Sequence, residues 1–183
     1  MTIRPADPAL DAAACAAIYA PSVEDDVTSF EERAPDRAEM AARIARVSAT
    51  HAWLVAEDGG EVVGYAYACP FQERPVYRWS VSVSVYVAAG RTREGLGRAL
   101  YEELFARLRR QGFQIACAGI TLPNEASVSL HERLGFVAIG VTRRIGWKRG
   151  AWRDVGWWQL ELVPVTERAP AEPRPPEPTA PPG

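Results

Sequence analysis

The longest regular pattern in the chain is an alternation of apolar and polar side chains between Arg78 and Val87. A period of two residues predicts a β-strand with two different faces. After a short stretch rich in glycine and arginine, leucines at every fourth position predict a helix over residues 97–111. One face of the strand carries Trp79, Val81, Val83, Val85 and Val87, and the other carries Ser80, Ser82, Ser84 and Tyr86.

Shorter patterns fill the rest of the first 163 residues. Strands over 52–57 and 61–68 flank Asp58-Gly59-Gly60, a sequence typical of a tight hairpin turn. Asp36, followed three residues later by Glu39, predicts the N-terminal cap of a helix. This order predicts an α/β (α+β) fold with a mixed, mainly antiparallel sheet flanked by helices. The other predicted elements are a strand at Ile3-Arg4, a helix marked by Leu10 to Ile18, a loop from Pro21 to Pro35, a strand over 114–121, a helix over 127–134 stopped by Gly135, and strands over 136–145 and 155–163.

The C-terminal segment, residues 164–183, differs in composition from everything before it. It holds eight of the 15 prolines and almost no large apolar residue. Such a segment cannot build a core, so we expect a domain over residues 1–163 followed by a disordered proline-rich tail. A ligand for a proline-recognition module is the alternative interpretation. Four tryptophans just before the tail, Trp147, Trp152, Trp157 and Trp158, indicate a buried apolar seam.

Composition narrows the function classes. With 183 residues, 48% of them hydrophobic, and a net charge of −2, the chain suits one globular domain and offers no broad cationic face for nucleic acid. No apolar run is long enough to cross a membrane, and no secretory signal begins the chain, so we expect a cytoplasmic location. The three cysteines are scattered and fit a reducing compartment, and two histidines are too few for a zinc site.

The loop between the long strand and the long helix is suited to phosphate. Gly95 and Gly97 let backbone N–H groups face a ligand, and the dipole of the following helix favours an anion. The stretch has neither the lysine of a P-loop nor the third glycine of a dinucleotide fingerprint. A phosphate site of another kind is therefore expected.

The segment Thr92-Arg93-Glu94-Gly95-Leu96-Gly97 resembles the loop of the GNAT superfamily of N-acetyltransferases, with Thr92 where that pattern has Gln or Arg. The chain is similar to the phosphinothricin N-acetyltransferase branch of that superfamily over roughly residues 2 to 163. The segments that carry this similarity are Ile18-Tyr19 with Thr28 to Glu31, Gly64 to Ala68, Tyr77 to Val87, Leu122 to Phe136, and Gly146 to Gln159.

The resemblance implies acetyl-CoA as co-substrate, with no metal. Backbone groups of Val85, Tyr86 and Val87 are expected to pair with its pantetheine arm, and Asn124 to meet its thiol end. The pyrophosphate is expected to lie against Arg93, Glu94, Gly95, Leu96, Gly97 and Arg98.

The catalytic base is where this chain departs from the family. The glutamate expected on the long strand is replaced by Ser82. Either Ser82 or Ser84 with a water, or His131, or a loop carboxylate such as Glu73 or Asp26, could take the proton instead. Tyr101 is compatible with a proton donor to the leaving thiolate, and core packing fits both Tyr101 and His131 equally.

The acceptor implied by the resemblance is the amine of a small amino-acid-like compound of the phosphinothricin or methionine sulfoximine type, acetylated directly in a ternary complex. Arg74 and Tyr77 match positions of its pocket, where a cation would meet a carboxylate, although a solvated loop arginine is the alternative for Arg74. Phe30 could form an apolar wall of that pocket or simply cover the core. Other amines (a polyamine, an aminoglycoside or a protein N-terminus) remain possible acceptors. A non-catalytic acyl-CoA sensor is a further alternative, because of Ser82. The family also implies a homodimer.

Overall fold

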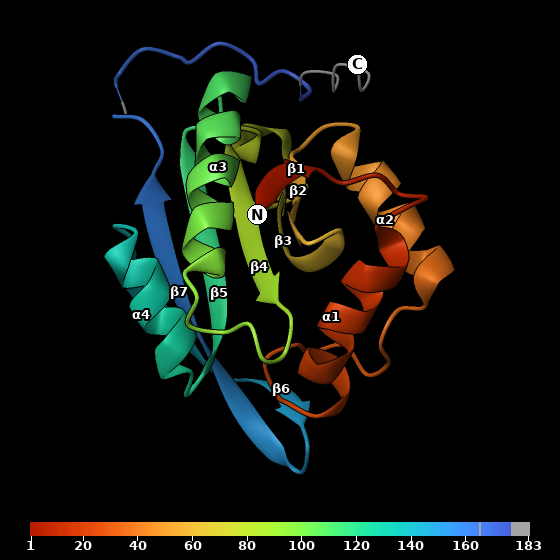
Figure 1. Cartoon of the computed structure of the whole chain (residues 1–183). Helices are drawn as coiled ribbons and strands as arrows, with labels where there is room; N and C mark the ends of the chain where they lie inside the picture. The colour runs from red at the N-terminus through yellow and green to blue at the C-terminus, as the bar shows by residue number, and fades with distance from the viewer. Residues whose placement is uncertain (165, 177–183) are drawn as a thin grey trace.

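The computed structural model describes residues 1–164 and 166–176 and contains a seven-stranded sheet in this part of the chain (Figure 1). The strand order is β1-β2-β3-β4-β5-β7-β6, and all neighbours are antiparallel except β4 and β5. The predicted fold class is thus confirmed. The elements are β1 (Thr2–Pro5), α1 (Ala12–Glu24), α2 (Arg37–Ser48), β2 (Trp53–Asp58), β3 (Glu61–Pro70), the 3₁₀ turn η1 (Pro75–Tyr77), β4 (Ser80–Val87), α3 (Leu96–Gln111), β5 (Ile115–Leu122), α4 (Glu125–Arg133), β6 (Val137–Lys148) and β7 (Ala151–Glu161).

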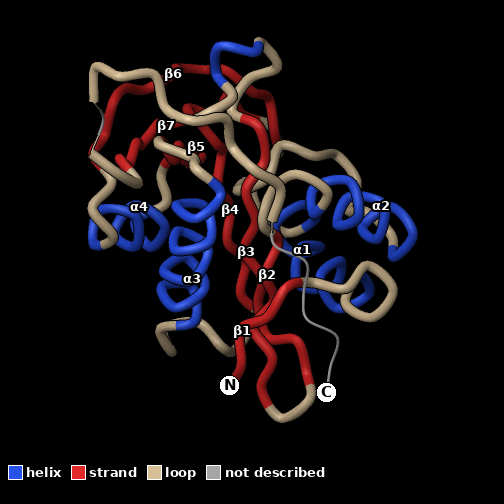
Figure 2. Tube along the Cα trace, turned by 90° about the horizontal axis from the view of Figure 1, so that it is seen from above, coloured by secondary structure: helices blue, strands red, loops and turns tan. Residues whose placement is uncertain are grey.

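Helices cover both faces of the sheet. Figure 2 shows α3 and α4 on one side and α1 and α2 on the other. Val81 and Val83 share a core with Leu100 and Leu104 of α3, while the opposite face of β4 sends Tyr86 into the core under α1. The alternation along β4 therefore separates two packed layers, which is why the serine face is only partly exposed.

Local signals placed several boundaries correctly. The side chain of Asp36 accepts a hydrogen bond from the backbone N–H of Glu39 at 2.8 Å, which confirms the predicted cap of α2. Gly59 and Gly60 adopt positive φ angles of 60° and 86° in the predicted hairpin turn. Gly112, with φ of 96°, ends α3.

Helix α1 is longer than expected. It continues through Pro21 to Glu24, where the sequence predicts a loop. A proline removes only one N–H donor from the helix, whereas continuation buries Val23 in the core beneath α1. Tertiary packing therefore outweighs the local cost.

The β6–β7 hairpin is also longer than predicted, and the expected tryptophan seam is wrong for half its members. Trp147 and Trp152 are 62% and 57% exposed and form an edge-to-face pair across the hairpin. The two indoles lie near the projecting tip of the hairpin (Figure 1), on the strand face opposite to Gly146 and Lys148. Only Trp158 is fully buried, and the half-buried Trp157 donates to the hydroxyl of Thr142.

The described part of the proline-rich segment contacts the body of the protein. The indole N–H of Trp79 donates to the carbonyl oxygen of Ala171 at 2.9 Å. Gln111 and Arg174 exchange two hydrogen bonds at the end of α3, which the segment crosses in Figure 1. The domain boundary at residue 163 and the disorder of the tail stay predictions, and residues 165 and 177–183 of the tail lie outside the described residues. No helix in the described ranges has the length and apolar character needed to cross a bilayer.

Candidate active site

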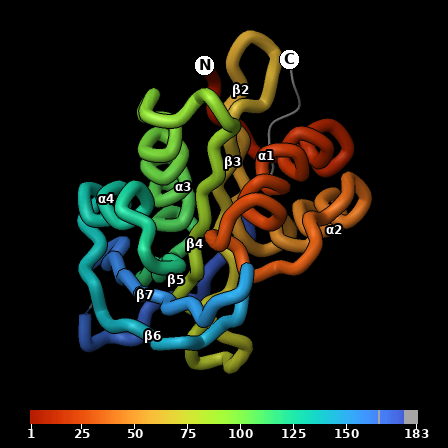
Figure 3. The backbone as a smooth tube through the Cα atoms, turned by 90° about the horizontal axis from the view of Figure 1, so that it is seen from below, coloured from red at the N-terminus to blue at the C-terminus, as the bar shows by residue number. Residues whose placement is uncertain are grey.

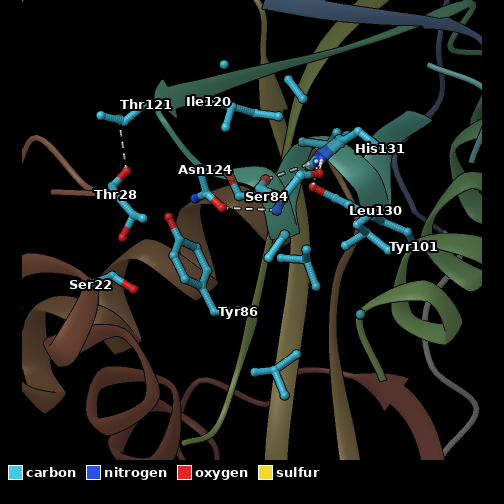
Figure 4. Close-up of a pocket in the computed structure, with 18 of the residues that line it drawn as sticks. Ser22, Thr28, Ser84, Tyr86, Tyr101, Ile120, Thr121, Asn124, Leu130 and His131 are labelled. Atoms are coloured by element: carbon cyan, nitrogen blue, oxygen red, sulfur yellow. Dashed lines mark hydrogen bonds between the residues drawn. The ribbon is translucent and has the colours of Figure 1, made fainter. Parts of the chain in front are cut away.

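The candidate site lies where two central strands separate. β4 and β5 are paired only along Ser80–Ser82 and Ile115–Cys117, although both strands continue well beyond. A cavity of about 340 Å³ opens past the last pair (Figure 4). Its walls include Ser84, Val85, Tyr86 and Val87 of β4, Gly119, Ile120 and Thr121 of β5, Tyr101 of α3, Asn124, Ser127 and His131, and Asp26 and Thr28 of the α1–α2 connection.

The separation leaves one edge of β4 open to a ligand. On its other side β4 stays paired with β3 as far as Val87, opposite Gly64. The backbone groups of Val85 to Val87 that would face β5 therefore have no strand partner there and can pair with an extended chain. This fits the pantetheine role expected of Val85, Tyr86 and Val87.

A second cavity, of about 890 Å³, lies over the N-terminus of α3 and shares Val87, Thr92 and Gly97 with the first. Gly95 has a positive φ of 81°, and an added Cβ at Gly97 would approach Leu130 at 3.3 Å. The α3 N-terminus thus presents its backbone N–H groups to this hollow without side-chain obstruction. Its lining includes Arg93, Leu96 and Arg98, together with Ser129 and Arg133 of α4.

The arginines around this hollow are not equivalent. Arg91 is held by Glu94 and Asp58, both at 2.8 Å, and Arg98 is held by Glu102. Within the described ranges Arg93 forms no ion pair, which leaves its charge available for an anion. The expected diphosphate contacts thus fit Arg93, Gly95 and Gly97, whereas the side chain of Glu94 is turned to Arg91.

Tyr101 and His131 form a hydrogen-bonded pair behind the first cavity. The Tyr101 hydroxyl lies 3.1 Å from Nε2 of His131, and Nδ1 lies 2.8 Å from the carbonyl oxygen of Ser127. Because a carbonyl can only accept, Nδ1 carries the hydrogen, and Nε2 accepts from Tyr101. The pair reaches the cavity wall from α3 and α4 (Figure 4).

Burial controls the charge of this pair. His131 is 4% exposed, and burial lowers the pKa of its imidazole below the ordinary value, so the ring is neutral at pH 7. Burial also raises the pKa of the Tyr101 phenol well above its ordinary value, which keeps the hydroxyl protonated. A neutral imidazole whose Nε2 lone pair already accepts from a neutral hydroxyl can take one proton through that hydroxyl and return it.

Ser82 is the last residue of β4 that is paired with β5. It lies between Cys69 of β3 and Cys117 of β5. Ser84, two residues along on the same face, lines the cavity, and Ser82 does not. Ser84 is the register partner of Tyr67 of β3. A base role for Ser82 remains a prediction.

The structure divides the predicted acceptor residues. Phe30 belongs to the connection that supplies Asp26 and Thr28 to the cavity, and its ring packs on Gly146 of β6. Arg74 and Tyr77 instead line a separate cavity of about 550 Å³ beside the proline-rich segment. Within one chain they do not meet Phe30.

Asn124 has two roles. Its side-chain oxygen accepts from the backbone N–H of Ser127 at 3.0 Å and caps α4, and the residue also lines the cavity. In Figure 4 the ring of Tyr86 points toward it. The expected position beside the thiol end of the co-substrate therefore coincides with a helix cap.

Sequence reasoning missed Thr121, whose hydroxyl reaches the carbonyl oxygen of Thr28 at 3.5 Å across the cavity mouth. No spacing signal relates two residues so far apart in the chain. It also gave no role to Lys148, which contacts the α1–α2 connection. The described residues contain no group of three or more His, Cys, Asp or Glu side chains placed to hold a metal ion.

Known proteins share this architecture and sequence. The family described as acetyltransferase (GNAT) domain matches residues 6–157. Phosphinothricin N-acetyltransferase of Streptomyces viridochromogenes is 41% identical over 96% of this chain and 93% of its own length. L-methionine sulfoximine/L-methionine sulfone acetyltransferase of Salmonella typhimurium is 37% identical over 88% of this chain and 95% of its own.

A solved structure extends the likeness to three dimensions. The GNAT superfamily phosphinothricin acetyltransferase of Sinorhizobium meliloti, in complex with acetyl-CoA, aligns with a TM-score of 0.88 and 36% identity, covering 93% of each chain. With the strand separation, the open α3 N-terminus and these matches in agreement, the chain belongs to the GNAT acetyltransferase family, in its phosphinothricin N-acetyltransferase-like branch.

Proposed function

We propose that this protein transfers the acetyl group of acetyl-CoA to the amine of a small amino-acid-like compound of the phosphinothricin or methionine sulfoximine type. The observation that carries the proposal is the gap between β4 and β5, which joins the open α3 N-terminus to the Tyr101–His131 pair. Relatives that act on such compounds, by their names, cover almost the whole chain.

Acetyl-CoA, when bound, supplies an activated acetyl thioester. The backbone N–H groups at Gly95 to Gly97 and the guanidinium of Arg93 would hold its diphosphate. The open edge of β4 would align its pantetheine arm. Both reactants would then lie in one cavity, and holding two reactants in the right orientation by itself accelerates a reaction strongly. Direct transfer in a ternary complex requires no covalent enzyme intermediate, and the proposed reaction uses no metal.

Tyr101 and His131 would accept the proton of the amine in place of the missing glutamate. As the neutral amine nitrogen bonds to the thioester carbon, the Tyr101 oxygen would accept the proton that the nitrogen loses, while the hydroxyl hydrogen passes to Nε2 of His131. Once the C–S bond breaks, the charged imidazole returns a proton to Tyr101, which donates to the sulfur. The pair thus carries one proton from nitrogen to sulfur and ends in its starting state.

The test is CoA release from acetyl-CoA with phosphinothricin, methionine sulfoximine, methionine sulfone and ordinary amino acids as acceptors. We expect turnover with at least one of the first three and a product that carries an N-acetyl group by mass spectrometry. Acetyl-CoA binding without turnover on any amine would contradict the proposed enzymatic activity and support a non-catalytic acyl-CoA sensor. Turnover confined to a polyamine, an aminoglycoside or a protein N-terminus would replace the proposed acceptor class.

We further propose a homodimer. β6 is an edge strand of the sheet, and its outward residues Val137, Ile139, Val141 and Ile145 are all more than half exposed. An apolar edge of this length is a surface that a second copy can cover. A monomer in sedimentation at all concentrations would contradict the dimer.

The three cysteines are free thiols, two of them buried, which supports a location in a reducing compartment such as the cytoplasm.

A further inference from the structure

The connection between α1 and α2 forms one wall of the cavity without regular secondary structure of its own. It supplies Asp26 and Thr28 to the lining, on the side opposite the α3 and α4 residues (Figure 4). A wall of this kind keeps its shape only if other elements hold it. The contacts that hold it come from distant parts of the sequence.

Lys148, the last residue of β6, holds the backbone of this connection. Its ammonium group donates to the carbonyl oxygens of Val23 at 2.7 Å, Ser29 at 2.6 Å and Glu31 at 3.0 Å. An ammonium has three donors, and here all three end on backbone oxygens. Figure 3 shows the β6–β7 hairpin reaching the end of α1 and this connection.

A second contact from β6 fixes the same segment. The ring of Phe30 lies so close to Gly146 that an added Cβ there would be 2.4 Å from a ring carbon. Only glycine admits the ring in this position. β6 therefore holds both the backbone and one side chain of the connection.

The far side of the connection is held by side chains of α1 and α2. Arg43 donates to both carboxylate oxygens of Glu31, at 2.7 and 2.8 Å, and the Tyr19 hydroxyl reaches Glu31 and Ser29. The hydrogen bond from Arg43 lowers the pKa of the Glu31 carboxyl, so this anchor stays charged at neutral pH. The connection is thus held from both sides, and among the described residues Lys148 is the one cation that bonds its main chain.

We propose that Lys148 is a positioning residue for the acceptor amine: by holding the main chain of Ser29 and Glu31, it sets the shape of the cavity wall at Asp26 and Thr28. It touches neither reactant. This inference rests on the proposed acetyltransferase activity, because the acceptor is what the wall would contact. Loss of the clamp affects acceptor binding and leaves the co-substrate site, which lies on α3 and β4, unaltered.

The test compares Lys148→Met, which keeps the length of the side chain, with Arg149→Asn. Arg149 is the neighbouring cation and donates only to the carbonyl of Glu24, outside the wall, and asparagine tolerates its positive φ of 51°. We expect Lys148→Met to raise the KM for the acceptor roughly tenfold or more, with the acetyl-CoA Kd from calorimetry unchanged. Arg149→Asn should leave both constants near those of the wild type.

Hydrogen exchange gives a readout that does not need turnover. The backbone N–H of Ser29 bonds the carbonyl of Ser22, and that of Glu31 bonds the Ser29 hydroxyl. Both amides should exchange faster in Lys148→Met and at the wild-type rate in Arg149→Asn. If the wild type acetylates no amine, the proposed function is wrong. The exchange comparison still shows whether Lys148 holds the α1–α2 connection.

Gly146→Ala is the second variant, for the case that Lys148→Met does not fold. It keeps the lysine and displaces Phe30, so the acceptor KM should again rise while acetyl-CoA binding holds. Unchanged KM and unchanged exchange in Lys148→Met, or equal losses of amine and acetyl-CoA binding in both variants, would overturn the proposal.

Discussion

On the side of β4, α3 and α4, the walls of both cavities come from one stretch of chain, residues 83–134. Many of the contacts expected there are made by backbone groups. The opposite wall combines the end of α1, the α1–α2 connection and Thr121 of β5, and Lys148 at the tip of the β6–β7 hairpin holds that connection from outside the cavity. Backbone recognition at a helix N-terminus depends on local conformation. The acceptor wall depends on contacts between residues more than 90 positions apart. One family can therefore keep its co-substrate site while the acceptor side varies.

The largest expected effect separates chemistry from binding. Tyr101→Phe removes the proposed proton relay and should lower kcat by roughly 10²–10⁴, with little change in the acetyl-CoA Kd. Tyr65→Phe is the matched control, because Tyr65 is equally buried and lies outside the cavity. Steady-state kinetics and calorimetry on both variants provide the measurement. Full activity in Tyr101→Phe would show that the proton leaves by another route.

A large side chain in the cavity over the N-terminus of α3 should disrupt the proposed acetyl-CoA site. Gly97→Val places methyl groups against Leu130 and should weaken acetyl-CoA binding by about 100-fold, since the ligand and the side chain would occupy the same space. Ala99→Val, on the same helix and outside both cavities, controls for the lower helix propensity of valine. Equal acetyl-CoA affinities in the two variants would show that the diphosphate does not bind at the N-terminus of α3.

A smaller effect is expected from the charge over that hollow. Arg93→Asn, a substitution that tolerates the positive φ of 69° at this position, should raise the acetyl-CoA Kd by roughly 3–10-fold at low salt and by less at high salt, because an exposed charge is screened. Arg110→Asn removes another exposed arginine at the other end of α3 and should change neither the affinity nor its salt dependence. A salt-independent loss in Arg93→Asn would indicate a structural role for Arg93.

The smallest effect concerns pH and distinguishes two buried histidines. Burial lowers the pKa of both His51 and His131, so each contributes stability that is complete above the unfolded pKa of about 6.5 and declines as pH falls toward the folded pKa. His51→Gln and His131→Gln should both flatten the fall in unfolding free energy between pH 8 and 5, measured with urea. Only His131→Gln should also reduce kcat/KM, because His51 stacks on Phe113 outside the cavity.

Most of the fold follows from local signals. The alternation in β4, the leucine spacing of α3, the two glycines of the β2–β3 turn and the Asp36 cap each depend on residues within a few positions of one another. The errors lie where packing outweighs those signals. Helix α1 continues through Pro21 because this buries Val23, and Trp147 and Trp152 stay exposed because they lie on the strand face opposite to Lys148, which contacts α1.

Local patterns in the chain specify the order of its elements and predict a glycine-bearing anion site at α3. The family resemblance adds the predicted residues of the co-substrate side. Long-range packing brings Tyr101 to His131, keeps Arg74 and Tyr77 apart from Phe30, and joins Lys148 to the α1–α2 connection. The reason is physical. Backbone periodicity and turn geometry are set by neighbours in the chain, whereas the partner of a buried side chain is set by how the layers pack.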